Sequence, residues 1–173
     1  MILRLARLGM GVYIYSPKND PLHRDDWRTP YPGKTMERFE ELHGLARMLG
    51  VSLSPGISPG RDMDLGDPAE RDILLEKLLP FTERGFRHFT LLFDDIEEDL
   101  EEPVTGELGA RHVELANSVK AELTRRAGEP VALWFVPTVY SSERQGRWPG
   151  GAGYVDALRH LAPDIPVLWT GTD

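Results

Sequence analysis

The stretch Phe89-Thr90-Leu91-Leu92-Phe93-Asp94-Asp95 joins an apolar run to two adjacent carboxylates. Its first five residues are mostly large and apolar, which is typical of a buried strand. The two aspartates come where that strand should end. Because parallel strands of α/β proteins carry functional residues at their carboxyl ends, this stretch indicates both a fold class and a place for chemistry.

Similar apolar runs recur on both sides of this stretch and alternate with helical patterns. The predicted strands span 12–15, 51–53, 89–93, 131–136 and 167–169. The predicted helices span about 35–49, 68–84, 108–127 and 154–161. The stretch 54–60 is rich in Gly and Pro, and we expect it to be irregular. The second predicted helix has a marked start, because Asp67 suits the N-cap, Pro68 the first turn and Glu70 a capping box.

Strict alternation of strands and helices predicts parallel strands joined by right-handed crossovers. No Gly-rich phosphate motif follows the first strand, whereas polar residues follow several strand ends, so a (β/α)8 barrel is favoured over a doubly wound sheet. We therefore expect an α/β fold. The expected unit is a single partial barrel domain over residues 1–173, with about five parallel strands.

Composition narrows the classes of partner. The net charge of −8 disfavours both a nucleic-acid phosphate backbone and an anionic membrane. The chain has no Cys, which excludes disulfides, thiolate metal sites and a thiol nucleophile. Its start lacks a signal-peptide core and no apolar run reaches membrane-spanning length, so we expect a cytoplasmic protein as written, or a secreted one if the true start lies upstream.

Asp94 and Asp95 allow three interpretations. Two neighbouring carboxylates in a half-buried site repel each other, which leaves one anionic and one protonated, as acid–base chemistry on a glycosidic bond requires. Judged from the residue types alone, a solvated turn is a more common role for such a pair than catalysis. The third interpretation is a metal site, because Glu97, Glu98 and Asp99 add hard oxygen ligands, although their spacing does not match an EF-hand.

Other polar and aromatic residues follow strand ends. Lys18 suits a sugar hydroxyl or a carboxylate, but a surface lysine is the commoner outcome. Tyr140 suits a substrate carbonyl, with packing at the barrel rim as its alternative. Trp27 and Arg28 fit sugar stacking or structural packing about equally well, and Trp169 fits a pocket wall or, more often, the core.

Five short motifs resemble glycoside hydrolase family 84, which contains O-GlcNAcases and related bacterial β-N-acetylglucosaminidases once called hyaluronidases. The motifs lie in order along nearly the whole chain, within residues 13–28, 57–60, 91–96, 137–140 and 167–171. They include Tyr13-Ile14-Tyr15-Ser16-Pro17-Lys18-Asn19-Asp20, Leu91-Leu92-Phe93-Asp94-Asp95-Ile96 and Pro137-Thr138-Val139-Tyr140.

The resemblance implies a retaining, substrate-assisted reaction through an oxazoline, with no cofactor and no metal. Asp94 matches the residue that accepts from the substrate acetamido N–H, and Asp95 matches the general acid. Tyr140 matches the hydroxyl that orients the acetamido oxygen, and Lys18 matches a ligand of a sugar hydroxyl. The implied partner is a GlcNAc-containing glycan or glycoconjugate.

The resemblance also implies that the five predicted strands are the second to sixth of a barrel. Three alternatives to an active glycosidase therefore stay open: an inactive barrel fragment, a GlcNAc-binding remnant, and a metal-dependent hydrolase using the acidic loop. Self-association that completes the barrel is a further expectation.

Overall fold

The computed structural model describes residues 1–96 and 103–170. Its sheet has four parallel strands in the order β1-β2-β3-β4. They are β1 (Val12–Tyr15), β2 (Ser52–Ile57), β3 (His88–Leu92) and β4 (Ala132–Val136). Because spatial order follows chain order, each crossover joins neighbouring strands, as in a barrel. The predicted α/β class and parallel sheet are confirmed.

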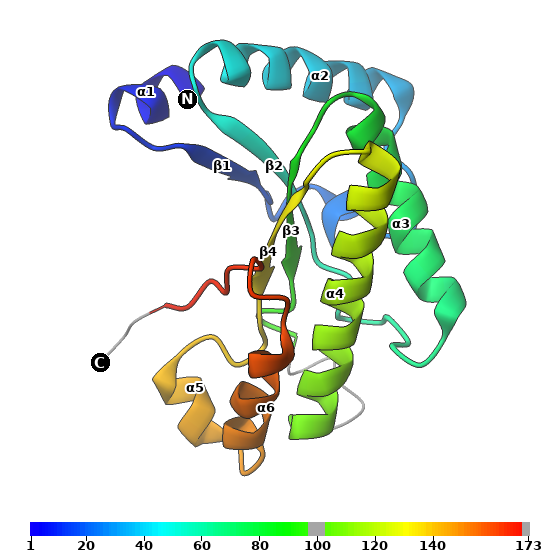
Figure 1. The fold of residues 1–173 in the computed structure, drawn as a ribbon, viewed down its shortest axis with the longest axis vertical. Helices are drawn as coiled ribbons and strands as arrows, with labels where there is room; N and C mark the ends of the chain where they lie inside the picture. Colours follow the sequence, from blue (N-terminus) through cyan, green and yellow to red (C-terminus); the bar gives the residue numbers. More distant parts are fainter. Residues whose placement is uncertain (97–102, 171–173) are drawn as a thin grey trace.

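The helices are α1 (Ile2–Arg7), α2 (Gly33–Met48), α3 (Pro68–Glu83), α4 (Gly106–Ala127), α5 (Ser142–Arg147) and α6 (Gly151–Ala157). Single 3-10 turns occupy Pro21–His23 and Leu158–His160. In Figure 1, α2, α3 and α4 lie along one side of the sheet, while α5 and α6 lie beyond the carboxyl end of β4, with α6 beside α4 and α5 beside α6. The helix layer therefore leaves the carboxyl ends of the strands to the loops.

Local capping explains where the helices begin and end. The side chain of Asp67 accepts a hydrogen bond from the Ala69 N–H at 2.8 Å, and Pro68 occupies the first turn of α3. Thr105 caps α4 in the same way, accepting from the Leu108 N–H at 3.3 Å. Gly128 ends α4 with a left-handed φ of 69°, which glycine adopts without a Cβ penalty.

Alternate residues of each strand face opposite sides of the sheet. Phe89 and Leu91 of β3 and Leu133 and Phe135 of β4 are buried within the main apolar core. The intervening residues face the other side, where Ser54 and Thr90 join hydroxyls at 2.8 Å. Parallel strands buried against a helix layer on one face are what the apolar runs predicted.

Four details differ from the sequence predictions. The stretch 54–60 is not irregular throughout, because β2 continues through Pro55 and Gly56 to Ile57. Gly56 is required there, since a Cβ would come within 2.9 Å of the Tyr15 carbonyl oxygen. Glu70 does not form a capping box; its carboxylate binds Arg28 instead.

The fifth predicted strand, 167–169, is reduced to one parallel bridge between Val167 and Phe135. Two hydrogen bonds hold it, from the Phe135 N–H to Pro166 at 2.9 Å and from the Leu168 N–H to Phe135 at 2.8 Å. Pro166 lacks an N–H, which limits the ladder at its start. The short helix α5, in contrast, was not predicted.

Candidate functional site

The two aspartates lie immediately beyond β3, where the backbone turns sharply. The Phe93 N–H still donates to the Val136 carbonyl at 2.8 Å, so the β3–β4 ladder runs to the edge of the pair. Asp95 then adopts φ 53°, the one left-handed non-glycine residue in the part of the chain described. Aspartate tolerates this region better than most residues, and the turn separates the environments of the two carboxyl groups.

Asp95 is the more exposed of the two and is bound from the loop after β4 and from α5. Its Oδ1 accepts from the Tyr140 hydroxyl at 2.8 Å and from Arg144 Nη2 at 2.8 Å. The Arg144 guanidinium also lies over the Tyr140 ring, 4.3 Å from its centroid. Burial and the bond to Asp95 raise the pKa of Tyr140 to about 12, so its hydroxyl remains a donor at neutral pH.

Asp94, in contrast, is half-buried. Burial raises the pKa of its carboxyl above the usual value, and the charge of Asp95 raises it further. The nearby Arg24 and His23 lower that pKa and partly offset the rise. The two carboxyl groups therefore lie in different environments, one half-buried and one exposed.

The loop that carries Tyr140 is fastened by a buried polar network. The Tyr154 hydroxyl of α6 accepts from the Thr138 N–H at 3.1 Å and lies 2.8 Å from His112 Nδ1 of α4. Burial lowers the pKa of His112 to about 3, so its ring is neutral, and its tautomer decides whether Nδ1 or the Tyr154 hydroxyl is the donor in this contact. The Tyr140 carbonyl in turn accepts from the Thr170 N–H at 2.8 Å.

The structure brings together three of the four predicted site residues: Asp94, Asp95 and Tyr140. Lys18 lies exposed on the loop after β1, at the same edge of the sheet but separated from β3 by β2. It takes no part in the hydrogen bond from Tyr140 to Asp95.

Two residues considered for sugar stacking have structural roles. Trp27 is fully buried and donates through Nε1 to Asp62 at 2.8 Å. Arg28 binds both Asp62 and Glu70, which ties the loop after β1 to α3. Trp169, in contrast, is 38% exposed and does not belong to the core.

Two arginines at the site were not predicted as functional. Arg24 donates through Nη2 to the main-chain oxygen of Asp95 at 2.7 Å, and Arg144 pairs with the Asp95 side chain. Arg24 stands inside a motif that carries the family resemblance, so a signal existed for it. Arg144 lies in a polar segment without any pattern, and its role depends on tertiary contact.

The interpretation of the acidic stretch as a metal site depends largely on residues that the structure does not describe. Glu97, Glu98 and Asp99 lie outside the described residues. Within residues 1–96 and 103–170, no group of three or more His, Asp or Glu side chains is placed to hold a metal ion. Nor does any described helix have the length and apolar character needed to cross a membrane.

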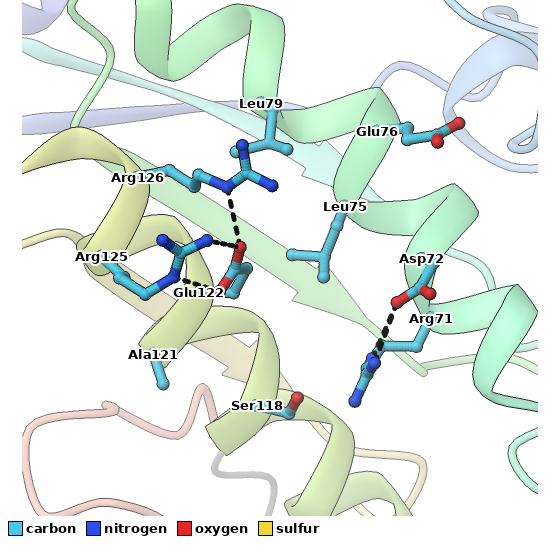
Figure 2. A pocket seen from close by; sticks show the side chains of 10 residues that line it. All are labelled: Arg71, Asp72, Leu75, Glu76, Leu79, Ser118, Ala121, Glu122, Arg125 and Arg126. Atoms are coloured by element: carbon cyan, nitrogen blue, oxygen red, sulfur yellow. Dashed lines mark hydrogen bonds and ion pairs between the residues drawn. The ribbon is translucent and has the colours of Figure 1, made fainter.

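A hollow of about 570 Å³ lies between α3 and α4, away from the aspartate pair (Figure 2). The half of α4 that lines it, including Glu122, leads into the start of β4, so the hollow is near the amino ends of the strands. Its charges pair with one another, Arg71 with Asp72, and Arg125 and Arg126 with Glu122. It is separate from the candidate site.

Comparison with known proteins connects this geometry to a family. The family described as β-N-acetylglucosaminidase matches residues 1–173, the whole chain. The chain belongs to this family. Protein O-GlcNAcase of Rattus norvegicus is 32% identical over 172 residues, which is 97% of this chain and 18% of the rat protein. Protein O-GlcNAcase of Mus musculus matches to the same extent.

A solved structure supports the assignment of this chain to glycoside hydrolase family 84. The structure of CpGH84B superposes with a TM-score of 0.82 and 30% identity, covering 99% of this chain and 30% of that one. The chain thus spans about a fifth of the O-GlcNAcases and under a third of CpGH84B. The resemblance noted from the motifs, and the α/β fold it implied, are confirmed.

Proposed function

We propose that this chain carries the catalytic pair of a retaining β-N-acetylglucosaminidase that removes terminal GlcNAc from a glycan or glycoconjugate. The observation that carries the proposal is the placement of two carboxyl groups at the end of β3, with Asp94 half-buried and Asp95 exposed and bonded to the Tyr140 hydroxyl at 2.8 Å. Family membership and the O-GlcNAcase relatives support the substrate class.

In the first step, the acetamido oxygen of the substrate attacks the anomeric carbon. A C–O bond forms to that carbon while the glycosidic bond breaks, and the proton of Asp95 goes to the leaving oxygen. Asp94 accepts a hydrogen bond from the acetamido N–H and stabilises the positive charge of the oxazoline. An anionic Asp94 is needed for this role.

In the second step, Asp95 accepts a proton from water as the water opens the oxazoline. The two displacements at the anomeric carbon give net retention. A nucleophile that already belongs to the substrate needs only to be held in line, so most of the catalytic gain is positional.

Tyr140 and Lys18 act as binding residues in this proposal. The Tyr140 hydroxyl donates to the acetamido oxygen, which would have to replace Asp95 as its acceptor. The raised pKa of Tyr140 keeps the proton available for that bond. Lys18, on the exposed loop after β1, would reach a sugar hydroxyl.

The test is release of 4-methylumbelliferone from its β-N-acetylglucosaminide by the purified chain. We expect Asp95→Asn and Asp94→Asn each to lower kcat at least roughly 100-fold, since each removes a group that acts in the transition state. Asp72→Asn is the matched control, because Asp72 is an exposed aspartate on α3 paired with Arg71. Turnover that persists in both site variants would contradict the proposal.

The same assay separates the alternatives. Loss of turnover with EDTA would favour the metal-dependent hydrolase. A folded chain that binds GlcNAc without turnover would favour the binding remnant. Sedimentation at several protein concentrations tests self-association, which stays a prediction.

A further inference from the structure

We propose that Arg24 is a positioning residue for the aspartate pair: it fixes the main chain at Asp95 and places a positive charge beside Asp94. Its effect on catalysis rests on the proposed function, whereas its effect on the pair itself does not.

The main-chain conformation at Asp95 is stabilised by a contact from a distant part of the chain. With φ 53°, Asp95 occupies the left-handed region, which is unfavourable for an L residue although aspartate tolerates it better than most. Arg24 Nη2 donates to the Asp95 carbonyl oxygen at 2.7 Å, across 71 positions of the chain. Because φ sets the direction of the Cα–Cβ bond, this contact also helps to aim the Asp95 carboxyl at Tyr140 and Arg144.

Arg24 can restrain the main chain at Asp95 because the loop that carries Arg24 is itself fixed by hydrogen bonds. The neighbouring His23 is buried, lies with Nδ1 3.3 Å from the Gly56 carbonyl, and accepts through its own carbonyl from the Ser58 N–H at 2.8 Å. On the other side, the buried Lys77 of α3 donates to the Leu22 carbonyl at 2.6 Å. The loop is thereby tied to β2 and to α3.

Charge gives Arg24 a second effect. Among the described residues, the charged and titratable groups that act on Asp94 are Asp95, Arg24 and His23. Tyr140 and Arg144 approach the pair from the loop after β4 and from α5. Burial lowers the pKa of His23, so at neutral pH Arg24 is the permanent cation among the groups that favour an anionic Asp94. Its Nε is buried and has no hydrogen-bond acceptor within the described residues.

The test compares three variants by two readouts. Arg24→Gln removes the charge and the main-chain hold, and Arg24→Lys keeps the charge. Arg28→Gln is the matched control, because Arg28 is an arginine of the same loop that pairs with Asp62 and Glu70. The readouts are the carbon-13 carboxyl titration of Asp94, which needs no activity, and kcat and KM on the aryl glycoside.

We expect Arg24→Gln to move the Asp94 titration midpoint to higher pH and to lower kcat roughly 10- to 100-fold, with a much smaller change in KM. Arg24→Lys should keep the midpoint close to wild type and restore kcat in part. Arg28→Gln should leave the midpoint in place even if it lowers Tm.

An unchanged Asp94 midpoint in folded Arg24→Gln, or an equal shift in Arg28→Gln, would overturn the proposal. A wild-type chain without turnover whose Asp94 midpoint still responds to Arg24→Gln would disprove the glycosidase function and leave the positioning role intact. Turnover that Arg24→Gln leaves unaffected would uphold the glycosidase function and disprove the positioning role of Arg24.

Discussion

Asp94 and Asp95 are adjacent in the chain but differ in environment. Asp95 makes its hydrogen bonds with Tyr140 and Arg144 in a partly exposed position. Asp94 is half-buried, and burial is the main cause of its raised pKa. Unequal environments are what allow two carboxyl groups to take different roles in one reaction.

The raised pKa of Asp94 has a consequence for stability. The folded chain holds this proton up to a higher pH than the unfolded chain does, so stability falls as pH rises from the ordinary value through the raised one. We expect Asp94→Asn to be at least as stable as wild type at about pH 7. It should lose any advantage near pH 3, where the Asp94 carboxyl of wild type is protonated in both the folded and the unfolded chain. Urea unfolding at both values measures this. An Asn variant that is less stable at both would indicate a structural role for the carboxylate.

Among the elements, α6 determines how the loop after β4 is held. The Tyr154 hydroxyl is the shared partner of the Thr138 N–H and the His112 ring, both buried. Tyr154→Phe leaves these two groups without that partner, so we expect a loss of about 1–3 kcal/mol in the free energy of unfolding. Urea denaturation checks it, with Tyr13→Phe on β1 as control. A loss no larger than in the control would mean that the network does not stabilise the fold.

The contact between α4 and α6 depends on small residues. A Cβ at Gly109 would lie 2.9 Å from the Tyr154 carbonyl oxygen and 3.1 Å from the Ala157 Cβ. We therefore expect Gly109→Ala to destabilise the fold by about 1–3 kcal/mol. Gly44→Ala on α2 is the matched control, because a Cβ there meets nothing within 4 Å, and we expect a gain of roughly 0.5–1 kcal/mol. Thermal unfolding of the two variants should move in opposite directions; a tolerated Gly109→Ala would show that the helices separate easily.

For the whole molecule, the histidines control the response to acid. Burial lowers the pKa of His23, His43, His88 and His112, the last to about 3. Between these lowered values and the ordinary value of about 6.5, the unfolded chain binds more protons than the folded one, so stability rises with pH.

We accordingly expect the urea midpoint to fall between about pH 7 and pH 5, in a range where ordinary carboxyl groups change little. His112→Gln should flatten this dependence, whereas His160→Gln, at an exposed position, should leave it unchanged. Equal slopes in wild type and His112→Gln would show that another group is responsible.

The sequence alone determined the local structure and most of the site. Apolar runs, the Asp67 cap, Gly128 and the alternation of strands with helices depend on neighbours in the chain. They predicted the main helices and five strands, four of which form the sheet. The placement of Asp94, Asp95 and Tyr140 at strand ends followed from the same order.

The tertiary structure decided what joins these residues. Arg24 and Arg144 reach Asp95 across 71 and 49 positions, and β2 continues through Pro55 and Gly56 between two strands that accept it. The segment 167–169 forms only one bridge although its residues suit a strand. Such contacts depend on where the loops bring distant segments together, and propensities that act over a few residues do not specify that path.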